Sequence, residues 1–254
     1  MADTGFTFNG IHSKDKGITL QGPVQVSAPK PKRGSISIPG RNGNIRQHDG
    51  SFEDRTIRVP CYMLSDYEGN RIGEINHWLF ADDAYHKFTD DSDSTHFYLA
   101  KATAGAGIQL RAGVLNDFTL QFDAKPQRFL KSGEEPIVLG ALSVGAEKNI
   151  INPNGFEAAP LIKVSGLSVS NHDGVQLWFQ DENGNESVLE ININVTLKDL
   201  TYDAEMDFSY NDTVSLDALV TVNDPIRLKA GKTTIYITNG SAQNITIVPR
   251  WWTL

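Results

Sequence analysis

Cysteine is almost missing from this chain of 254 residues, in which Cys61 is the single example. One cysteine excludes an internal disulfide and a thiolate metal cluster. Cys61 lies in a strand-like run after Val59 and Pro60, where a cysteine is usually an inert core residue. No apolar run approaches the roughly 18 residues of a membrane span, and the first residues lack the segments of a secretory leader. We therefore expect that the protein is made in a reducing cytoplasm and does not associate with a membrane.

Recognisable catalytic motifs are missing as well. The sequence contains no nucleophile elbow, phosphate-binding loop, dinucleotide fingerprint or zinc-protease motif. The acidic residues are numerous enough to include a glycosidase pair, but none of them stands out by position. The sequence therefore predicts no catalytic residue, no cofactor and no enzymatic activity.

Two groups of residues could be taken for metal ligands, but both are better explained as solvent-exposed polar residues. Five aspartates follow one another within a short stretch: Asp82, Asp83, Asp90, Asp91 and Asp93. They lack the spacing and the glycine of a calcium-binding EF-hand, which favours a solvated loop after a helix. His77, His86 and His96 match no zinc spacing and are better explained as exposed polar residues. We expect no metal site.

An excess of positive charge is also missing. Residues 1–134 carry 16 Lys and Arg against 16 Asp and Glu, whereas residues 135–254 carry 7 against 15 and supply the whole net charge of −8. Nucleic-acid binding needs a positive face for phosphates, so sequence-specific nucleic-acid binding is not expected. The neutral first half can associate with copies of itself without like-charge repulsion.

What the sequence does contain is alternation of apolar and polar residues, which predicts a mainly β protein. Residues 118–123 alternate in this way and predict a half-buried strand that Pro126 ends. Residues 55–62 and 96–100 predict two further strands. The turn signals at Asn42 and Gly43 predict a reversal of the chain.

One helix is expected at about residues 66–80. Ser65 and Glu68 have the spacing of a capping box at its start. An apolar stripe at helical spacing follows, formed by Ile72, Ile75, Trp78 and Leu79. The helix should end near Phe80, because Asp82 and Asp83 are unfavourable at the negative end of a helix dipole.

The second half reads as a domain of its own. Residues 131–149 are the expected boundary, which divides the chain into domains at 1–134 and 135–254. Short strands then recur with turns between them, at residues 161–164, 175–180, 188–195, 205–210, 226–228, 232–238 and 244–251. Residues 181–185 and 238–241 are expected to connect hairpins. Seven or more short strands without a helical period predict a β-sandwich.

The second half also contains three tryptophans. Trp178 has apolar neighbours on both sides and is expected in the core. Trp251 and Trp252 are adjacent, so in a strand they face opposite ways. One of these two should be core and the other a surface aromatic that could contact a partner or a sugar.

The order of these elements resembles the distal tail proteins of long, flexible-tailed bacteriophages. The resemblance extends over nearly the whole chain. No single motif is diagnostic, so it depends on the order and spacing of all the pieces. Its pieces are Phe6-Thr7-Phe8-Asn9-Gly10, Pro39-Gly40-Arg41-Asn42-Gly43, Gly50-Ser51-Phe52-Glu53-Asp54-Arg55-Thr56-Ile57, Trp78-Leu79-Phe80, His96-Phe97-Tyr98-Leu99-Ala100, residues 118–123, residues 154–166 and Pro249-Arg250-Trp251.

The resemblance implies a structural hub at the tail tip of a virion, made in the host cytoplasm. An N-terminal β-sandwich-type domain with one helix would form a homo-hexameric ring around a DNA channel, and a galectin-like β-sandwich would project outward. The implied partners are the major tail tube protein, the tail-associated lysin or fibre protein and receptor-binding proteins. Candidate residues for the ring or partner interface are Lys32, Arg33, Arg41, Asn42, Arg46 and Asp54. A lectin-like module for cell-wall glycans and a wall-cutting enzyme remain as alternatives.

Overall fold

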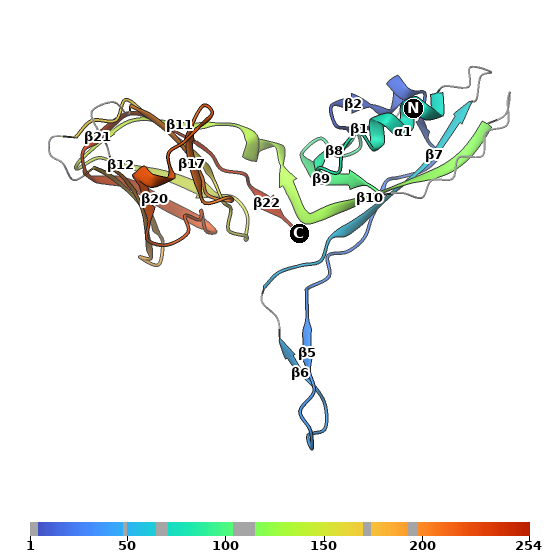
Figure 1. The fold of residues 1–254 in the computed structure, drawn as a ribbon, viewed down its shortest axis with the longest axis horizontal. Helices are drawn as coiled ribbons and strands as arrows, with labels where there is room; N and C mark the ends of the chain where they lie inside the picture. Colours follow the sequence, from blue (N-terminus) through green and yellow to red (C-terminus); the bar gives the residue numbers. More distant parts are fainter. Residues whose placement is uncertain (1–4, 48–49, 65–70, 104–114, 170–173, 193–197) are drawn as a thin grey trace. The chain divides into compact units, whose positions relative to one another are not determined.

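The computed structural model describes residues 5–47, 50–64, 71–103, 115–169, 174–192 and 198–254 (Figure 1). The chain forms two compact units: unit 1 contains Met1–Arg128 and Leu254, and unit 2 is Phe129–Thr253. The division therefore follows Arg128, whereas the expected domains met at residue 134. Each unit has its own hydrophobic core. The protein is mainly β, as the alternating patterns predicted, and the described part contains a single α-helix.

Unit 1 is built on a sheet with the strand order β2-β1-β8-β9-β10-β7-β3, and β4 also pairs with β7. A long antiparallel ladder joins β7 to β10, with Leu115 opposite Leu64 at one end and Ala124 opposite Arg55 at the other. The predicted strands at residues 55–62 and 96–100 are confirmed. The strands are β1 (Phe6–Phe8), β2 (Ile11–His12), β3 (Thr19–Leu20), β4 (Gln25–Val26), β5 (Gly34–Ile36), β6 (Ile45–Gln47), β7 (Arg55–Leu64), β8 (His86–Asp90), β9 (His96–Ala102) and β10 (Leu115–Leu130), with a 3-10 helix at Ser13–Lys16.

Aromatic rings form the centre of the unit 1 core. Phe6 stacks on Phe88 with ring centroids 5.3 Å apart, and Phe8 lies 5.0 Å from Phe122. All four side chains are essentially fully buried. Because they come from three strands that are distant in the sequence, the cluster ties the first residues of the chain to the middle of the sheet.

Helix α1 (Arg71–Leu79) packs against this core. Ile75, Trp78 and Leu79 are buried, which confirms the predicted apolar stripe and the end of the helix near residue 80. Trp78 also donates a hydrogen bond from Nε1 to the carbonyl of Phe8 at 3.0 Å, so its polar end is satisfied inside the core. The predicted capping box at residues 65–68 lies outside the described residues.

Strand β10 corrects the prediction that Pro126 ends a strand, because β10 continues to Leu130. The ladder with β7 stops at Ala124, so it does not need the N–H that Pro126 lacks. At its end β10 enters unit 2, where the N–H of Leu130 donates to the carbonyl of Trp251 at 2.9 Å.

Unit 2 is a β-sandwich of two antiparallel sheets. One has the order β11-β21-β13-β16-β17-β18 and the other has the order β12-β20-β14-β15-β19. Their inner faces enclose one core that includes Leu177, Ile235, Ile247 and Trp251. The strands are β11 (Ile137–Ser143), β12 (Glu147–Asn152), β13 (Leu161–Ser165), β14 (Val175–Asp181), β15 (Glu186–Ile191), β16 (Asp199–Asp203), β17 (Phe208–Asn211), β18 (Val214–Ser215), β19 (Val220–Val222), β20 (Gly231–Asn239), β21 (Ser241–Val248) and β22 (Trp252–Thr253), with 3-10 helices at Lys131–Glu134 and Asp217–Leu219.

Residues 131–149, the expected boundary, contain β11 and the start of β12. Two expectations for this half were wrong. Residues 226–228 form no strand and contribute the isolated bridge between Leu228 and Ala158. The turn at residues 238–241 exists, but it joins β20 to β21 in the opposite sheet and so closes no hairpin.

Candidate interaction surfaces

A two-stranded arm extends from the sheet of unit 1 (Figure 1). We define the arm as residues 27–54. Its two chains run side by side: Ser27 N–H donates to the carbonyl of Thr56, and Glu53 N–H donates to the carbonyl of Lys30. Further out, β5 and β6 pair with each other in a separate two-stranded sheet. Gly40 and Gly43 have φ values of +79° and +82° at the tip, which a glycine adopts without strain. The predicted reversal at residues 42–43 is confirmed.

The arm exposes branched aliphatic side chains that its own unit does not cover. Ile36, Ile38 and Ile45 are 50%, 38% and 39% exposed. Ile36 lies directly opposite Ile45 in the β5–β6 register, so these two side chains share one face. An isolated two-stranded hairpin is marginally stable in water. This face therefore has the character of a surface that another molecule covers.

The residues predicted for an interface all fall on this arm. Lys32 and Arg33 lie on its outgoing chain, and Arg41 and Asn42 lie at the tip. Arg46 belongs to β6, although its side chain is outside the described part. Asp54 lies at the base and accepts a hydrogen bond from Tyr85 Oη at 2.7 Å, which raises the pKa of Tyr85 to about 12. Sequence reasoning did not find the isoleucines of the arm, because singly exposed apolar residues carry no distinctive pattern.

A groove of about 600 Å³ runs along the base of the arm. Charged side chains of both signs line it: Lys30, Glu53, Asp54 and Arg58. It is formed by β4, β7 and the segments that lead into the arm. A groove of mixed charge suits a polar protein segment better than a small apolar ligand.

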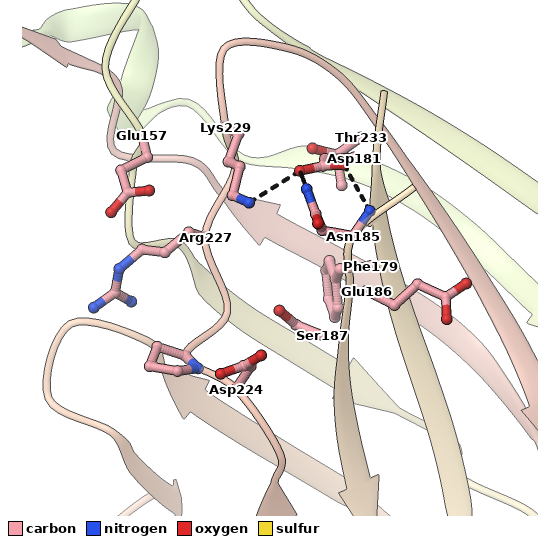
Figure 2. A pocket seen from close by; sticks show the side chains of 11 residues that line it. Glu157, Phe179, Asp181, Asn185, Glu186, Ser187, Asp224, Arg227, Lys229 and Thr233 are labelled. Atoms are coloured by element: carbon pink, nitrogen blue, oxygen red, sulfur yellow. Dashed lines mark hydrogen bonds and ion pairs between the residues drawn. The ribbon is translucent and has the colours of Figure 1, made fainter. Parts of the chain in front are cut away.

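A polar pocket of about 380 Å³ opens in unit 2, as Figure 2 shows. Four carboxylates and two cationic groups line it: Glu157, Asp181, Glu186, Asp224, Arg227 and Lys229. Lys229 Nζ lies 3.0 Å from Asp181 Oδ2, and Asn185 Nδ2 donates to the same oxygen at 2.8 Å (Figure 2). Arg227 Nη1 donates to the carbonyl of Ala204 at 2.6 Å. Asp181 and Lys229 thus pair with each other, whereas Arg227 is held by a backbone carbonyl.

Asp181 holds the turn between β14 and β15. Its Oδ1 accepts the backbone N–H groups of Asn183 and Asn185, both at 2.9 Å. The hydrogen bond from Asn185, with the contact from Lys229, holds the pKa of Asp181 well below its usual range. Such a carboxylate stays ionised at neutral pH and cannot donate a proton. Asp181 is therefore explained by the structure of the turn, and the predicted connection at residues 181–185 is confirmed.

The five aspartates, His86 and His96 are engaged locally, whereas His77 is exposed on α1. Asp82 Oδ1 lies 2.7 Å from His86 Nε2, and His96 Nδ1 lies 3.3 Å from Asp93. Other contacts of the acidic loop include Asp83 with Lys101, Asp90 with Ser92, Asp91 with His12 and Asp93 with Arg128. Among the described residues, no three His, Cys, Asp or Glu side chains are grouped to hold a metal ion. Cys61 is buried in β7, and burial raises the pKa of its thiol to about 12.

Trp178 differs from the prediction, whereas Trp251 and Trp252 are divided between the core and the surface as predicted. Trp178 is partly exposed and lies on the outer face of its sheet, so its expected core position was wrong. Its ring stacks on Tyr236 of β20 with centroids 6.1 Å apart, and its Nε1 donates to Thr238 Oγ1 at 2.8 Å. Trp251 is 4% exposed and belongs to the core, so it is not a surface aromatic. Trp252 is partly exposed and stacks on Phe156 at 4.6 Å.

Solved structures with the same arrangement come from phage tails. The crystal structure of the SPP1 Dit protein, described as a paradigm of the hub adsorption apparatus in phages that infect Gram-positive bacteria, superposes with a TM-score of 0.72. The alignment covers 99% of each chain at 16% sequence identity. This chain has the Dit fold.

Other phage-tail structures share the Dit fold more loosely. A chain of the phage P2 baseplate in its activated conformation with Ca matches with a TM-score of 0.50 at 9% identity, over 97% of this chain and 98% of that one. A P2 baseplate structure with Sr matches with a TM-score of 0.52 at 10% identity, over 96% and 97%. No protein-family model and no curated protein matches the sequence. Within the described residues, no helix has the length and hydropathy to cross a membrane.

Proposed function

We propose that this chain is a structural hub protein of a phage tail tip and not an enzyme. The observation that carries the proposal is the Dit fold, which extends over 99% of both aligned chains and so includes both units. A fold by itself does not determine function. The described surfaces add support, because they offer an exposed arm and a groove of mixed charge but no constellation of catalytic side chains among the described residues.

In the proposed assembly, six copies of unit 1 form a ring around a channel through which DNA passes. The arm of one copy lies against the next, so that Ile36 and Ile45 are covered in the ring although they are exposed in one chain. Such a heterologous contact, repeated from copy to copy by rotation about one axis, generates a closed ring. Lys32, Arg33, Arg41, Asn42, Arg46 and Asp54 belong to this contact or to the contacts with neighbouring tail proteins. One face of the ring would bind the tail tube protein, and the other would bind the tail-associated lysin or fibre protein and the receptor-binding proteins. The hub would be made in the host cytoplasm and would act in the virion.

Sedimentation analysis of the purified chain over a wide concentration range tests this proposal. We expect a concentration-dependent hexamer, seen as a ring in negative-stain images. The double substitution Ile36→Ser and Ile45→Ser should shift the equilibrium to the monomer without lowering the unfolding temperature. Val138→Ser, at a residue of unit 2 that is 66% exposed, is the matched control and should leave the hexamer intact. A chain that stays monomeric at every concentration would contradict the ring.

A second candidate function is binding of cell-wall glycans by unit 2. The observation that favours it is the partly exposed aromatic pair Trp178 and Tyr236, flanked by side chains that offer hydrogen bonds to hydroxyl groups. Glu186 Oε1 accepts from Tyr236 Oη at 2.9 Å and from Gln180 Nε2 at 2.8 Å, which holds these polar groups in place. We therefore propose the outer face of β14 and β20, in place of Trp251 and Trp252, as the candidate sugar platform.

A further inference from the structure

Arg55 is a buried cation with an incomplete set of hydrogen bonds. It is the first residue of β7, and it lies on the same face of the strand as Ile57 and Val59, the face that meets the core. The residue is 6% exposed, and its Nε and Nη2 atoms are buried without a hydrogen-bond partner. A guanidinium does not lose its proton in a protein, so this charge persists. A buried charge without an acceptor is unfavourable and requires an explanation.

A second guanidinium lies beside Arg55. Ala124 of β10 is directly opposite Arg55, and Arg128 follows four residues later on the same face of that strand. Burial and, to a smaller extent, the nearby Arg128 charge lower the pKa of Arg55. The Arg55 guanidinium carbon also lies 5.9 Å from the centre of the Tyr98 ring. Arg128 is itself only partly satisfied, because its Nε is buried without a partner.

Asp93, the carboxylate that pairs with Arg128, is already occupied. Asp93 Oδ2 accepts from Arg128 Nη2 at 2.5 Å. Asp93 Oδ1 accepts from the hydroxyl and the backbone N–H of Thr95 at 2.9 and 3.1 Å. Asp93 is therefore engaged by Arg128 and Thr95, and among the described residues no carboxylate is paired with Arg55.

We propose that Arg55, together with Arg128, binds an Asp or Glu side chain of a neighbouring copy of this chain when the ring forms. The inference rests on the proposed function, since a ring brings the same acidic chain to each copy. The planar fork of a guanidinium matches a carboxylate in two parallel hydrogen bonds. Residues 1–134 carry 16 basic and 16 acidic residues, so a neighbouring copy can offer a carboxylate to this site without like-charge repulsion between the first halves of the two chains. The side chain of Arg128 is 35% exposed, so the site is accessible from solvent beside it.

A purely structural role would give Arg55 a different signature. Its aliphatic stem could simply cover the end of the core, in which case an unbranched apolar residue would serve equally well. Arg55→Met tests this directly, because it keeps the stem and removes the charge. The isolated subunit should then unfold at the same or a higher temperature, while the dissociation constant of the ring should rise at least about 30-fold.

Two further variants complete the comparison. Arg55→Lys keeps the positive charge but cannot donate two parallel hydrogen bonds to a carboxylate, so this substitution should weaken the ring as well. Lys163→Met removes an exposed cation from β13 of unit 2 and should change neither assembly nor stability. A wild-type chain that forms rings together with an Arg55→Met chain that forms them equally well would overturn this site and leave the hub proposal intact. A wild-type chain that never associates would overturn both.

A measurement on the unmodified chain identifies the partner residue. Carbodiimide labelling followed by mass spectrometry compares the reactivity of each Asp and Glu in the ring and in the dissociated subunit. We expect one carboxylate to become protected in the wild-type ring and to remain reactive in the rings that Arg55→Met forms at high concentration. Labelling that is the same in ring and subunit at every carboxylate would refute the inference.

Discussion

Arg250 and Asp203 form a bidentate ion pair, in which Nη1 donates to Oδ1 at 2.7 Å and Nη2 donates to Oδ2 at 2.8 Å. Asp203 ends β16, whereas Arg250 lies just beyond β21 with a φ of +57°. The N–H of Arg250 also donates to the carbonyl of Gly133 at 2.8 Å. The pair therefore fastens the last residues of unit 2 to two distant segments of the same unit.

Loss of this carboxylate should destabilise unit 2. Asp203→Asn removes the carboxylate that accepts both hydrogen bonds of a partly buried guanidinium and leaves only Glu205, 3.7 Å from Nη1. We expect a loss of about 2 kcal/mol in the free energy of unfolding. Urea denaturation followed by tryptophan fluorescence measures it, because Trp251 lies in the core of this unit. Asp212→Asn, at an exposed position, is the control and should change stability by less than about 0.5 kcal/mol. Equal midpoints for the two variants would contradict this account.

The same pair predicts a defined acid response. Burial raises the pKa of Asp203, but the hydrogen bonds from Arg250 and from the N–H of Glu205 outweigh it, so the net pKa is lowered. A lowered folded pKa means that the stabilisation is complete above the unfolded value of about 3.9 and disappears as the pH falls below it. Urea midpoints measured between pH 2 and pH 6 should fall more steeply for the wild-type chain than for Asp203→Asn. Parallel curves would show that Asp203 does not titrate in this way.

Gly240 should resist substitution because two sheets meet at it. It has a φ of +80°, and a Cβ there would lie 2.7 Å from Val175 Cγ2 and 2.8 Å from the carbonyl oxygen of Ser168. Gly240→Ala should therefore cost about 2–3 kcal/mol. Gly184 has the same φ and open space around it, so Gly184→Ala should cost only about 1 kcal/mol. Chemical denaturation distinguishes the two, and equal losses would show that sterics at Gly240 do not matter.

If unit 2 binds a glycan, Trp178 should carry the binding. Trp178→Ala removes a ring of the exposed pair with Tyr236 and should weaken binding on a glycan array at least about tenfold. Trp252→Ala should have little effect on affinity, because that ring is occupied by its stack on Phe156. A blank array for the wild-type chain would remove the second candidate function, and an equal loss in both variants would remove the assignment to Trp178.

Local patterns predicted the elements whose two faces differ clearly. β7 and β9 followed from alternation, and α1 followed from the spacing of Ile75, Trp78 and Leu79. β11 was missed because its register with β21 shifts between Val138 and Gly140 and again before Leu142, which breaks a period of two. β12 was missed because Ile151 is 72% exposed, so its outward face is not polar.

The surfaces were predicted less well than the strands. Trp178 was placed in the core because Leu177 and Phe179 flank it, yet these neighbours face inward and Trp178 faces Tyr236 on the outside. The turn at the tip of the arm was predicted, but the exposure of Ile36 and Ile45 on the arm was not. Arg55 carried no signal at all, since a charged residue at the start of a strand is ordinary.

The sequence by itself determined that the protein is mainly β, where most strands and the helix lie, and that the negative charge is concentrated in the second half. These properties depend on neighbouring residues, whose period of two or 3.6 is visible without any partner. Only the tertiary structure decided that residues 239–241 pass between two sheets, that the arm stands apart from its unit and that Arg55 is buried. Each of these depends on which distant segment covers a given face, and burial is a property of that pairing and not of the local sequence.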